Sequence, residues 1–416
     1  MLFWLPPLST GGGLPGFRVQ SPINAAGRKP LYKVEEFYAE QDVEKVLGEG
    51  VRAEDINDDA LGRTLDRMAQ VDLKGLFSSV SLSCVLKDDI EVKSVHADTT
   101  SISVYGEYED DSAIIEINHG HSKDKRPDLQ QFVCGLLVNT EGIPLAGDVL
   151  SGNTSDKTWN GKVITELEAL FRKHGKDIVC VADSALVGKE NLELMAQEGI
   201  RFISRVPGTF GVEEAIKDIA WEKDDWVEMG TFSERYNAAA YRAQSFEQEI
   251  NGRRYRFIAV GSTSLDRQKE KTLTKRLAAE RLEIEKAARE LGKKGFYCQA
   301  DAEQAAVEFQ KEHGGHFSMG FQVKPEVTII RGRGRPRKGI EPVTETHYRV
   351  VLSVGTARQE VVQRTHERLS TFVLITNVPR EEMNDREVLS EYKSQGRTVE
   401  TKFRFLKTPR MWTASI

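Results

Sequence analysis

The pattern of hydrophobic and polar positions predicts a chain in which helices and strands alternate. Apolar residues recur at helical spacing in Val34–Leu47, Asp58–Leu76 and Asp156–His174. Ile178–Ala182 is instead a short unbroken apolar run, which is typical of a strand covered on both faces. A further helix and strand follow this run and complete a strand–helix–strand unit. The pattern therefore favours an α/β protein.

A strand-rich stretch lies between the first helices and that unit. Residues Ile90–Asp98 and Ser101–Tyr108 alternate in part and carry β-branched and aromatic side chains, so we expect two neighbouring antiparallel strands. Gln131–Asn139 and Ile143–Leu150, separated by a Thr-Glu-Gly turn, are expected to form the next two. The predicted strand Ile90–Asp98 ends on an acid, Asp98.

The character of the chain changes between residues 207 and 370. Two long polar strands surround the turn Asn251-Gly252, and a charged helix from about 266 to 291 follows. We interpret this stretch as an insertion. The core pattern resumes in the buried-type strand Phe372–Asn377, and a last helix is predicted from about Asp385 to Leu406.

Length and composition place broad limits on the protein. Its 416 residues exceed one small core, so two or three domains are expected. Hydrophobic residues make up 39% and charged residues 29%, which is ordinary for a soluble globular protein. No apolar run of ~18 residues exists, so a membrane span is excluded. The four cysteines lack metal-ligand spacing and predict free thiols in a reducing cytoplasm.

The net charge of −6 conceals a basic run at residues 331–338, Arg-Gly-Arg-Gly-Arg-Pro-Arg-Lys. This run resembles an AT-hook, in which glycine and proline keep the backbone extended. Arg333, Arg335 and Arg337 could then enter a narrow A·T minor groove beside Lys338. The alternative is a solvated loop that makes only salt-sensitive phosphate contacts. We favour contact with DNA in either form.

Three acids are candidates for chemistry. Asp98 and Asp183 each follow a predicted core strand, and Glu400 lies on the last helix, where Arg397 and Lys407 share its face. Two such charges 4 Å apart repel by about 4 kcal/mol at an effective dielectric near 20. Magnesium removes this penalty, and two ions ~4 Å apart assist displacement at phosphorus. The pattern alone also allows each acid to be a helix cap or turn former.

Four motifs sharpen this reading. They are His96-Ala97-Asp98-Thr99-Thr100-Ser101, Gly147–Trp159 (with Gly152-Asn153-Thr154-Ser155-Asp156), Val181-Ala182-Asp183-Ser184-Ala185-Leu186, and the segment from Tyr392 to Lys407. With these motifs, most of residues 31–412 resembles bacterial insertion-sequence transposases with a DDE triad, in the group marked by a Tyr-Arg-Glu-Lys signature. Glu400 and Lys407 keep the signature spacing, whereas Tyr392 and Arg397 are each one position away from theirs.

The resemblance implies a function and a site. Asp98, Asp183 and Glu400 would bind two Mg²⁺ ions, with Mn²⁺ as a substitute, while Tyr392, Arg397 and Lys407 contact DNA. The enzyme would be an endonuclease that hydrolyses a phosphodiester at a transposon end and uses the freed 3′-hydroxyl for strand transfer. Its partner would be double-stranded DNA, at transposon ends and target, in the cytoplasm at the nucleoid. A homodimer in the DNA complex, and a truncated, inactive relic that still binds DNA, stay open.

The resemblance also implies a ribonuclease-H-like mixed sheet flanked by helices and interrupted by a β-rich insertion, with a small helical N-terminal region. The expected organisation is a disordered or remnant segment 1–30, a helical region 31–86, a first catalytic part 87–206, an insertion 207–370 and a second catalytic part 371–416.

Other candidates carry less chemistry. The histidine pairs His119/His121 and His313/His316 lack companion ligands and are expected at the surface. His96 lies two positions before Asp98, so it either touches the site or packs. Asn153 and Asp156 are expected to be loop and helix-cap residues. Leu277, Ile284 and Leu291 recur every seven residues, which favours packing within the insertion over dimerisation.

Overall fold

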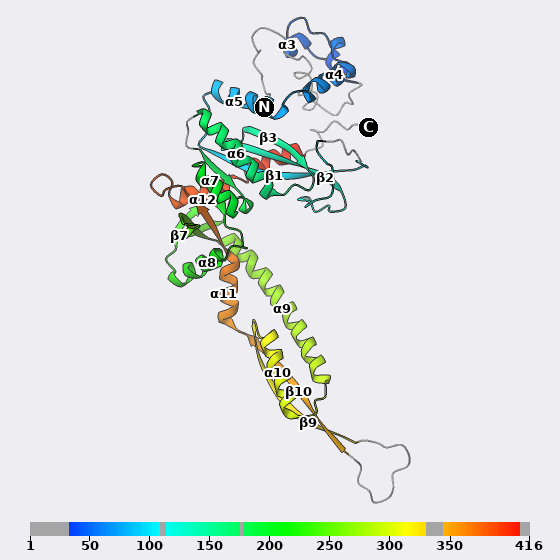
Figure 1. Ribbon diagram of the computed structural model, residues 1–416, viewed down its shortest axis with the longest axis vertical. Coiled ribbons are helices and arrows are strands. Elements are labelled where there is room, and N and C mark those ends of the chain that lie inside the picture. Colours follow the sequence, from blue (N-terminus) through cyan, green and yellow to red (C-terminus); the bar gives the residue numbers. More distant parts are fainter. Residues whose placement is uncertain (1–32, 109–113, 175–177, 330–343, 408–416) are drawn as a thin grey trace, which may run out of the picture. The chain divides into compact units, whose positions relative to one another are not determined.

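The computed structural model describes residues 33–108, 114–174, 178–329 and 344–407 (Figure 1). The chain divides into two compact units, the first formed by Met1–Pro207 with Ile375–Ile416 and the second by Gly208–Leu374. The predicted remnant at 1–30 and the basic run at 331–338 lie outside the described residues. Within the described part, no helix has the length and apolar character needed to cross a membrane.

The first unit is built on a mixed sheet with the strand order β3-β2-β1-β4-β5-β11. The strands are β1 (Ser94–Val104), β2 (Gln130–Asn139), β3 (Pro144–Ser151), β4 (Val179–Ala182), β5 (Arg201–Arg205) and β11 (Thr371–Thr376). Strands β1, β2 and β3 pair antiparallel, whereas β4 is parallel to β1 and β5 to β4. This is the ribonuclease-H-like arrangement, and the predicted α/β fold class is confirmed.

Helices surround this sheet and form the N-terminal region. They are α2 (Val34–Ala39), α3 (Val43–Leu47), η2 (Ala53–Asp55), α4 (Asp58–Ala69), α5 (Leu73–Lys87), α6 (Asp156–His174), η3 (Ser184–Leu186), α7 (Lys189–Gln197), α12 (Asp385–Ser394) and α13 (Val399–Leu406). The segments α2 to α4 bury a small core of their own around Tyr38 and Leu61. Helix α5 packs on β3, where Lys74 Nζ lies 3.3 Å from Asp148 Oδ2.

Strand β1 corrects the prediction of two strands at Ile90–Asp98 and Ser101–Tyr108. It is one continuous strand, and Asp98 lies in its interior opposite Leu136 of β2. The prediction was wrong because no turn-forming glycine, proline or asparagine separates the two stretches, and Thr99-Thr100 favours an extended backbone. Parallel pairing with β4 nevertheless ends at Ala97, so Asp98 stands where β1 passes the end of β4.

The predicted helix from Asp385 to Leu406 is interrupted, so that prediction was wrong. Helix α12 ends at Ser394 and α13 begins at Val399. Between them Gly396 weakens helical propensity, and the Arg397 N–H donates to the Ser394 carbonyl three residues back, at 2.8 Å. Arg397 therefore lies in the break and Lys407 caps the end of α13, so the single charged face predicted for the last helix does not exist.

The second unit contains strands and long helices. Its elements are α8 (Gly211–Lys223), β6 (Val227–Thr231), β7 (Ala240–Ile250), β8 (Arg253–Ser262), α9 (Thr263–Lys293), α10 (Gln299–His313), β9 (Phe317–Ile329), β10 (Thr344–Ala357) and α11 (Gln359–Ser370). Strands β6, β7 and β8 form an antiparallel series, and β9 pairs with β10 in a separate ribbon.

The hairpin turn and the long helix of this unit were both predicted from the sequence. Asn251 and Gly252 both have positive φ, 52° and 76°, as a tight hairpin turn requires. Leu277 and Leu291 of α9 pack with Ile284 in a cluster inside the unit, so the packing interpretation is confirmed. Strand β8, predicted as polar, is instead buried from Tyr255 onward.

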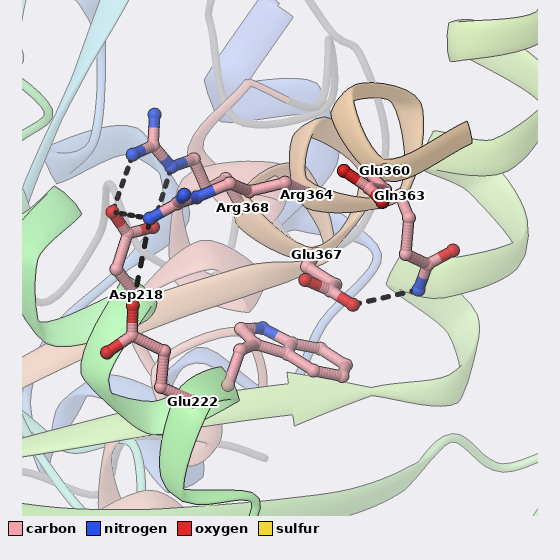
Figure 2. A pocket seen from close by; sticks show the side chains of 8 residues that line it. Asp218, Glu222, Glu360, Gln363, Arg364, Glu367 and Arg368 are labelled. Carbon is pink, nitrogen blue, oxygen red and sulfur yellow. Dashed lines mark hydrogen bonds and ion pairs between the residues drawn. The ribbon is translucent and has the colours of Figure 1, made fainter. Parts of the chain in front are cut away.

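Figure 2 shows a charged pocket between α8 and α11 of this second unit. Asp218 accepts from Arg364 at 3.1 Å and from both Nε and Nη2 of Arg368, at 2.7 and 2.6 Å. The hydrogen bonds from Arg368 lower the pKa of Asp218. No predicted site residue lines this pocket, and its central carboxylate is already paired. We therefore assign these ion pairs to holding α11 against α8.

Candidate active site

Asp98 and Asp183 are brought together by the parallel pairing of β1 and β4. Ala97 and Ala182 are register partners, so the acid that follows each stands beside the other. Strand β4 is buried throughout, and its carboxyl end is where Asp183 becomes accessible. The Asp183 carboxylate accepts from the Ala185 N–H at 3.0 Å and caps η3. The Asp98 carboxylate likewise accepts from the Thr99 N–H, at 2.8 Å.

Both carboxyl groups are harder to ionise than a free aspartate, because the pKa of each is raised. Burial raises the pKa of Asp98 to about 6, and the charges of Asp183 and Asp156 act in the same direction. Burial also raises the pKa of Asp183, again with Asp156 contributing. Raised carboxyl pKa values that come from burial and like charges are typical of functional sites.

Two residues of this site were not predicted. Lys123, in the loop between β1 and β2, lies with Nζ 3.4 Å from one oxygen of Asp98 and 3.4 Å from one oxygen of Asp156. Asp156 accepts from the Thr99 hydroxyl. It was expected to cap helix α6, but Ser155 does so by accepting from the Thr158 N–H at 3.2 Å. The only signal in the sequence was that Asp156 belongs to one of the four motifs.

Glu400 stands in the first turn of α13 and is exposed. The hydroxyl of Tyr392, on α12, is affected by the charge of Glu400 and by the charges of both aspartates. Burial raises the Tyr392 pKa, and the charges of Asp183, Asp98 and Glu400 raise it further, against the opposing effect of Arg205. The Tyr392 hydroxyl is therefore within electrostatic range of all three acids. In the described residues, however, no three acidic, histidine or cysteine side chains converge on one metal position.

The remaining predicted residues are distributed around this region. Arg397 is exposed in the break between α12 and α13. Lys407 Nζ lies 2.6 Å from Asp124 Oδ1, in the same loop as Lys123. The structure does not describe Arg333, Arg335, Arg337 or Lys338.

A buried pair connects β1 to α12. His96 is fully buried, and its Nε2 lies 2.9 Å from Glu391 Oε1. Ser94 also donates to Glu391. Burial opposes ionisation of Glu391, but the hydrogen bonds from His96 and Ser94 outweigh it and lower the Glu391 pKa. Of the two readings left open for His96, the structure supports packing and positioning, because its ring nitrogen is engaged by α12.

Replacing Glu391 by alanine should destabilise the protein by about 2 kcal/mol, because the buried side chains of His96 and Ser94 would lose a charged hydrogen-bond partner. Chemical denaturation of the wild type and E391A measures this. Glu381 is exposed and close in sequence, so E381A is a matched control expected to stay within about 0.5 kcal/mol. Equal losses in both variants would show that the pair does not hold α12 on β1.

Within the described part of the chain, the cysteines and the remaining histidines belong to no group of three or more potential metal ligands. Cys134 and Cys180 are buried free thiols, as predicted, and burial raises their pKa values to about 11 and about 12. His316 Nδ1 lies 3.0 Å from both carboxylate oxygens of Glu280. His119 and His121 are exposed.

Comparison with known proteins identifies a family to which the chain is similar. The family model described as "Transposase DDE domain" matches residues 95–414. A model described as a domain of unknown function (DUF4277) matches residues 23–82. No curated protein matches the chain.

Among solved structures, the Mos1 transposase paired-end complex with left transposon end is 10% identical, with 49% of this chain and 60% of that chain covered and a TM-score of 0.19. The piggyBac transposase synaptic complex with hairpin DNA is 9% identical, with 62% and 52% covered and a TM-score of 0.30. The Mos1 mariner paired end complex with Mn is 10% identical, with 49% and 61% covered and a TM-score of 0.19. The chain thus spans less than two thirds of each of these structures.

Proposed function

Because the chain belongs to the DDE transposase family, we propose that it cuts DNA at the ends of a bacterial insertion sequence and joins the freed 3′-hydroxyl to a target. The observation that carries this proposal is the pair Asp98 and Asp183. Their carboxylates are adjacent at the ends of parallel-paired segments and resist ionising together. Such a pair suits the binding of divalent cations and their phosphate substrates.

The donor set fits Mg²⁺, with Mn²⁺ as a substitute. Asp98 and Asp183 each accept a backbone N–H, and Asp183 also accepts a side-chain hydrogen bond from Asn160. Each carboxylate oxygen has two lone pairs, so both groups keep capacity to bind a cation. Glu400 is the third proposed ligand. It follows the break that contains Gly396, and its carboxylate lies beside that glycine. Bound ions would supply Lewis acidity to the oxygens that attack and leave phosphorus.

The other residues of the site would hold DNA. Lys407 would exchange Asp124 for a phosphate oxygen near the cut, since an ammonium group binds phosphate as a point charge. Arg397 is exposed and accessible to a backbone phosphate. Tyr392 is half-buried among the acids, and we assign it to positioning the cleaved strand.

The test is cleavage of DNA taken from both sides of the gene, where inverted repeats are expected. Purified protein is incubated with a duplex carrying such a repeat in Mg²⁺ or Mn²⁺, and the products are mapped to single-nucleotide resolution. We expect 3′-hydroxyl ends at the repeat boundary and joined products when target DNA is present. Specific binding without any cut would favour the inactive relic.

The basic run is proposed to hold DNA without contributing to the fold. Replacing Arg333, Arg335 and Arg337 by alanine should leave stability within about 0.5 kcal/mol per residue, since the run has no side chain that forms a core. DNA affinity should fall, and the slope of log K against log salt should decrease by roughly one for each phosphate that the variant no longer binds.

Fluorescence anisotropy across a salt series measures both quantities. A larger loss of affinity on A·T-rich than on G·C-rich duplexes would support insertion into the minor groove. Identical slopes for the wild type and the triple variant would place the DNA-binding surface elsewhere.

A further inference from the structure

The ammonium of Lys123 is held inside the acidic site by several partners. Nζ donates to the carbonyl oxygen and to the hydroxyl of Thr99, both at 2.8 Å. It also lies 3.4 Å from Asp98 and 3.4 Å from Asp156. The Lys123 charge opposes the rise in the pKa of both Asp98 and Asp183. This one side chain therefore reduces the repulsion among three carboxylates.

The loop that carries Lys123 is fixed to the sheet. The Lys123 N–H donates to Ser101 Oγ at 2.9 Å, and Asn118 pairs with Gln131 through backbone bonds of 3.2 and 3.0 Å. Gly120 and Gly152 let the loop approach the end of β3, because a Cβ at Gly120 would lie 2.0 Å from the Gly152 carbonyl oxygen. The position of the ammonium thus follows from the packing of the loop.

We propose that Lys123 is the internal cation of the metal-free site and that Asp156 is a fourth carboxylate of that site. A divalent cation that binds Asp98 should displace the ammonium, because Lys123 Nζ lies 3.4 Å from Oδ1 of the same carboxylate and two positive charges on one carboxylate repel. Lys123 is then a positioning residue. Its charge offsets the repulsion among the carboxylates and so stabilises the folded protein before the ions bind. This inference rests on the proposed function, since it assumes that Asp98 binds the catalytic ions.

The first experiment measures Mn²⁺ binding to the full chain by isothermal titration calorimetry, without DNA. Removing the competing charge in K123Q should lower the Kd for Mn²⁺ about tenfold. Lys157 is the matched control, because it lies one residue after Asp156 but is exposed and pairs with Glu190, 3.5 Å away. K157Q should bind Mn²⁺ like the wild type. Equal or weaker binding by K123Q than by the wild type would overturn the inference.

The second experiment measures melting temperature with and without Mn²⁺. In its absence K123Q should melt about 3 °C below the wild type, and saturating Mn²⁺ should remove most of this difference. The melting-temperature difference caused by K123Q should also be smaller in a D98N background, because the site then has one negative charge fewer for Lys123 to neutralise. A difference that is unchanged by Mn²⁺ and by D98N would mean that Lys123 only packs.

The two proposals fail in different ways. If the wild type and K123Q both fail to bind Mn²⁺, the metal site itself is wrong and the displacement inference falls with it. If the wild type binds Mn²⁺ through Asp98 and K123Q binds no better, the proposed function stands and the role of Lys123 is rejected.

Discussion

Replacing Asp183 by asparagine is expected to reduce DNA strand cleavage by about 1000-fold or more. The reason is that asparagine lacks the negative charge with which Asp183 would bind the divalent cations, and these cations would stabilise the charge that develops at phosphorus. The fold should survive, because the amide oxygen of asparagine can still accept from the Ala185 N–H that now bonds Asp183 at 3.0 Å. The same reasoning applies to D98N, whose amide oxygen keeps the Thr99 N–H bonded.

The measurement is the rate of 3′-end formation on a repeat-bearing duplex in Mg²⁺. Glu190 of α7 gives a matched control, because it is exposed and pairs only loosely with Lys157 at 3.5 Å. E190Q removes the same charge close to η3 and should cut DNA at the wild-type rate. E400Q should lose activity as D183N does. Wild-type cleavage by E400Q would rule out Glu400 as the third proposed metal ligand.

The metal-free protein should be less stable at pH 7.5 than at pH 5. The Asp98 pKa is raised from 3.8 to about 6, so the stability linked to its protonation is fully present below about pH 4 and is lost as the pH rises through about 6. A shift of this size corresponds to roughly 3 kcal/mol in total for this largely buried carboxyl, of which about 1.4 kcal/mol is lost between pH 5 and pH 7.5. The raised pKa of Asp183 acts in the same direction.

Groups with lowered pKa values do not mask this effect. Glu391 and Asp218 gain stability as the pH rises, but only up to their unfolded pKa values of 4.5 and 3.8, below the window tested. Thermal unfolding at pH 5 and 7.5, in chelator and in excess Mg²⁺, measures the prediction. The loss of stability at pH 7.5 should shrink in D98N and in Mg²⁺, because the ions bind the folded state. A pH profile that D98N leaves unchanged would exclude Asp98 as the titrating group.

The sequence by itself determined the elements with strong local signals. The unbroken apolar run before Asp183 became β4, the helical spacing of 156–174 became α6, and Asn251-Gly252 became a hairpin turn. These outcomes follow from hydrophobic period and from backbone conformations that few residues adopt. The sequence also placed Asp98 and Asp183 directly after predicted core strands, which is why the two acids were expected to lie close together.

The tertiary structure decided what depends on contacts between distant residues. Asp98 lies inside one long strand and not at a strand end, since β2 pairs along the whole of β1. The last helix breaks before Glu400, and His96 pairs with Glu391 although nearly three hundred residues separate them. Lys123 and Asp156 enter the site because Gly120 and Gly152 let their segments approach closely. Hydrophobic period reports which side of an element is buried, but it carries no information on which charged side chains the sheet and its loops then bring together.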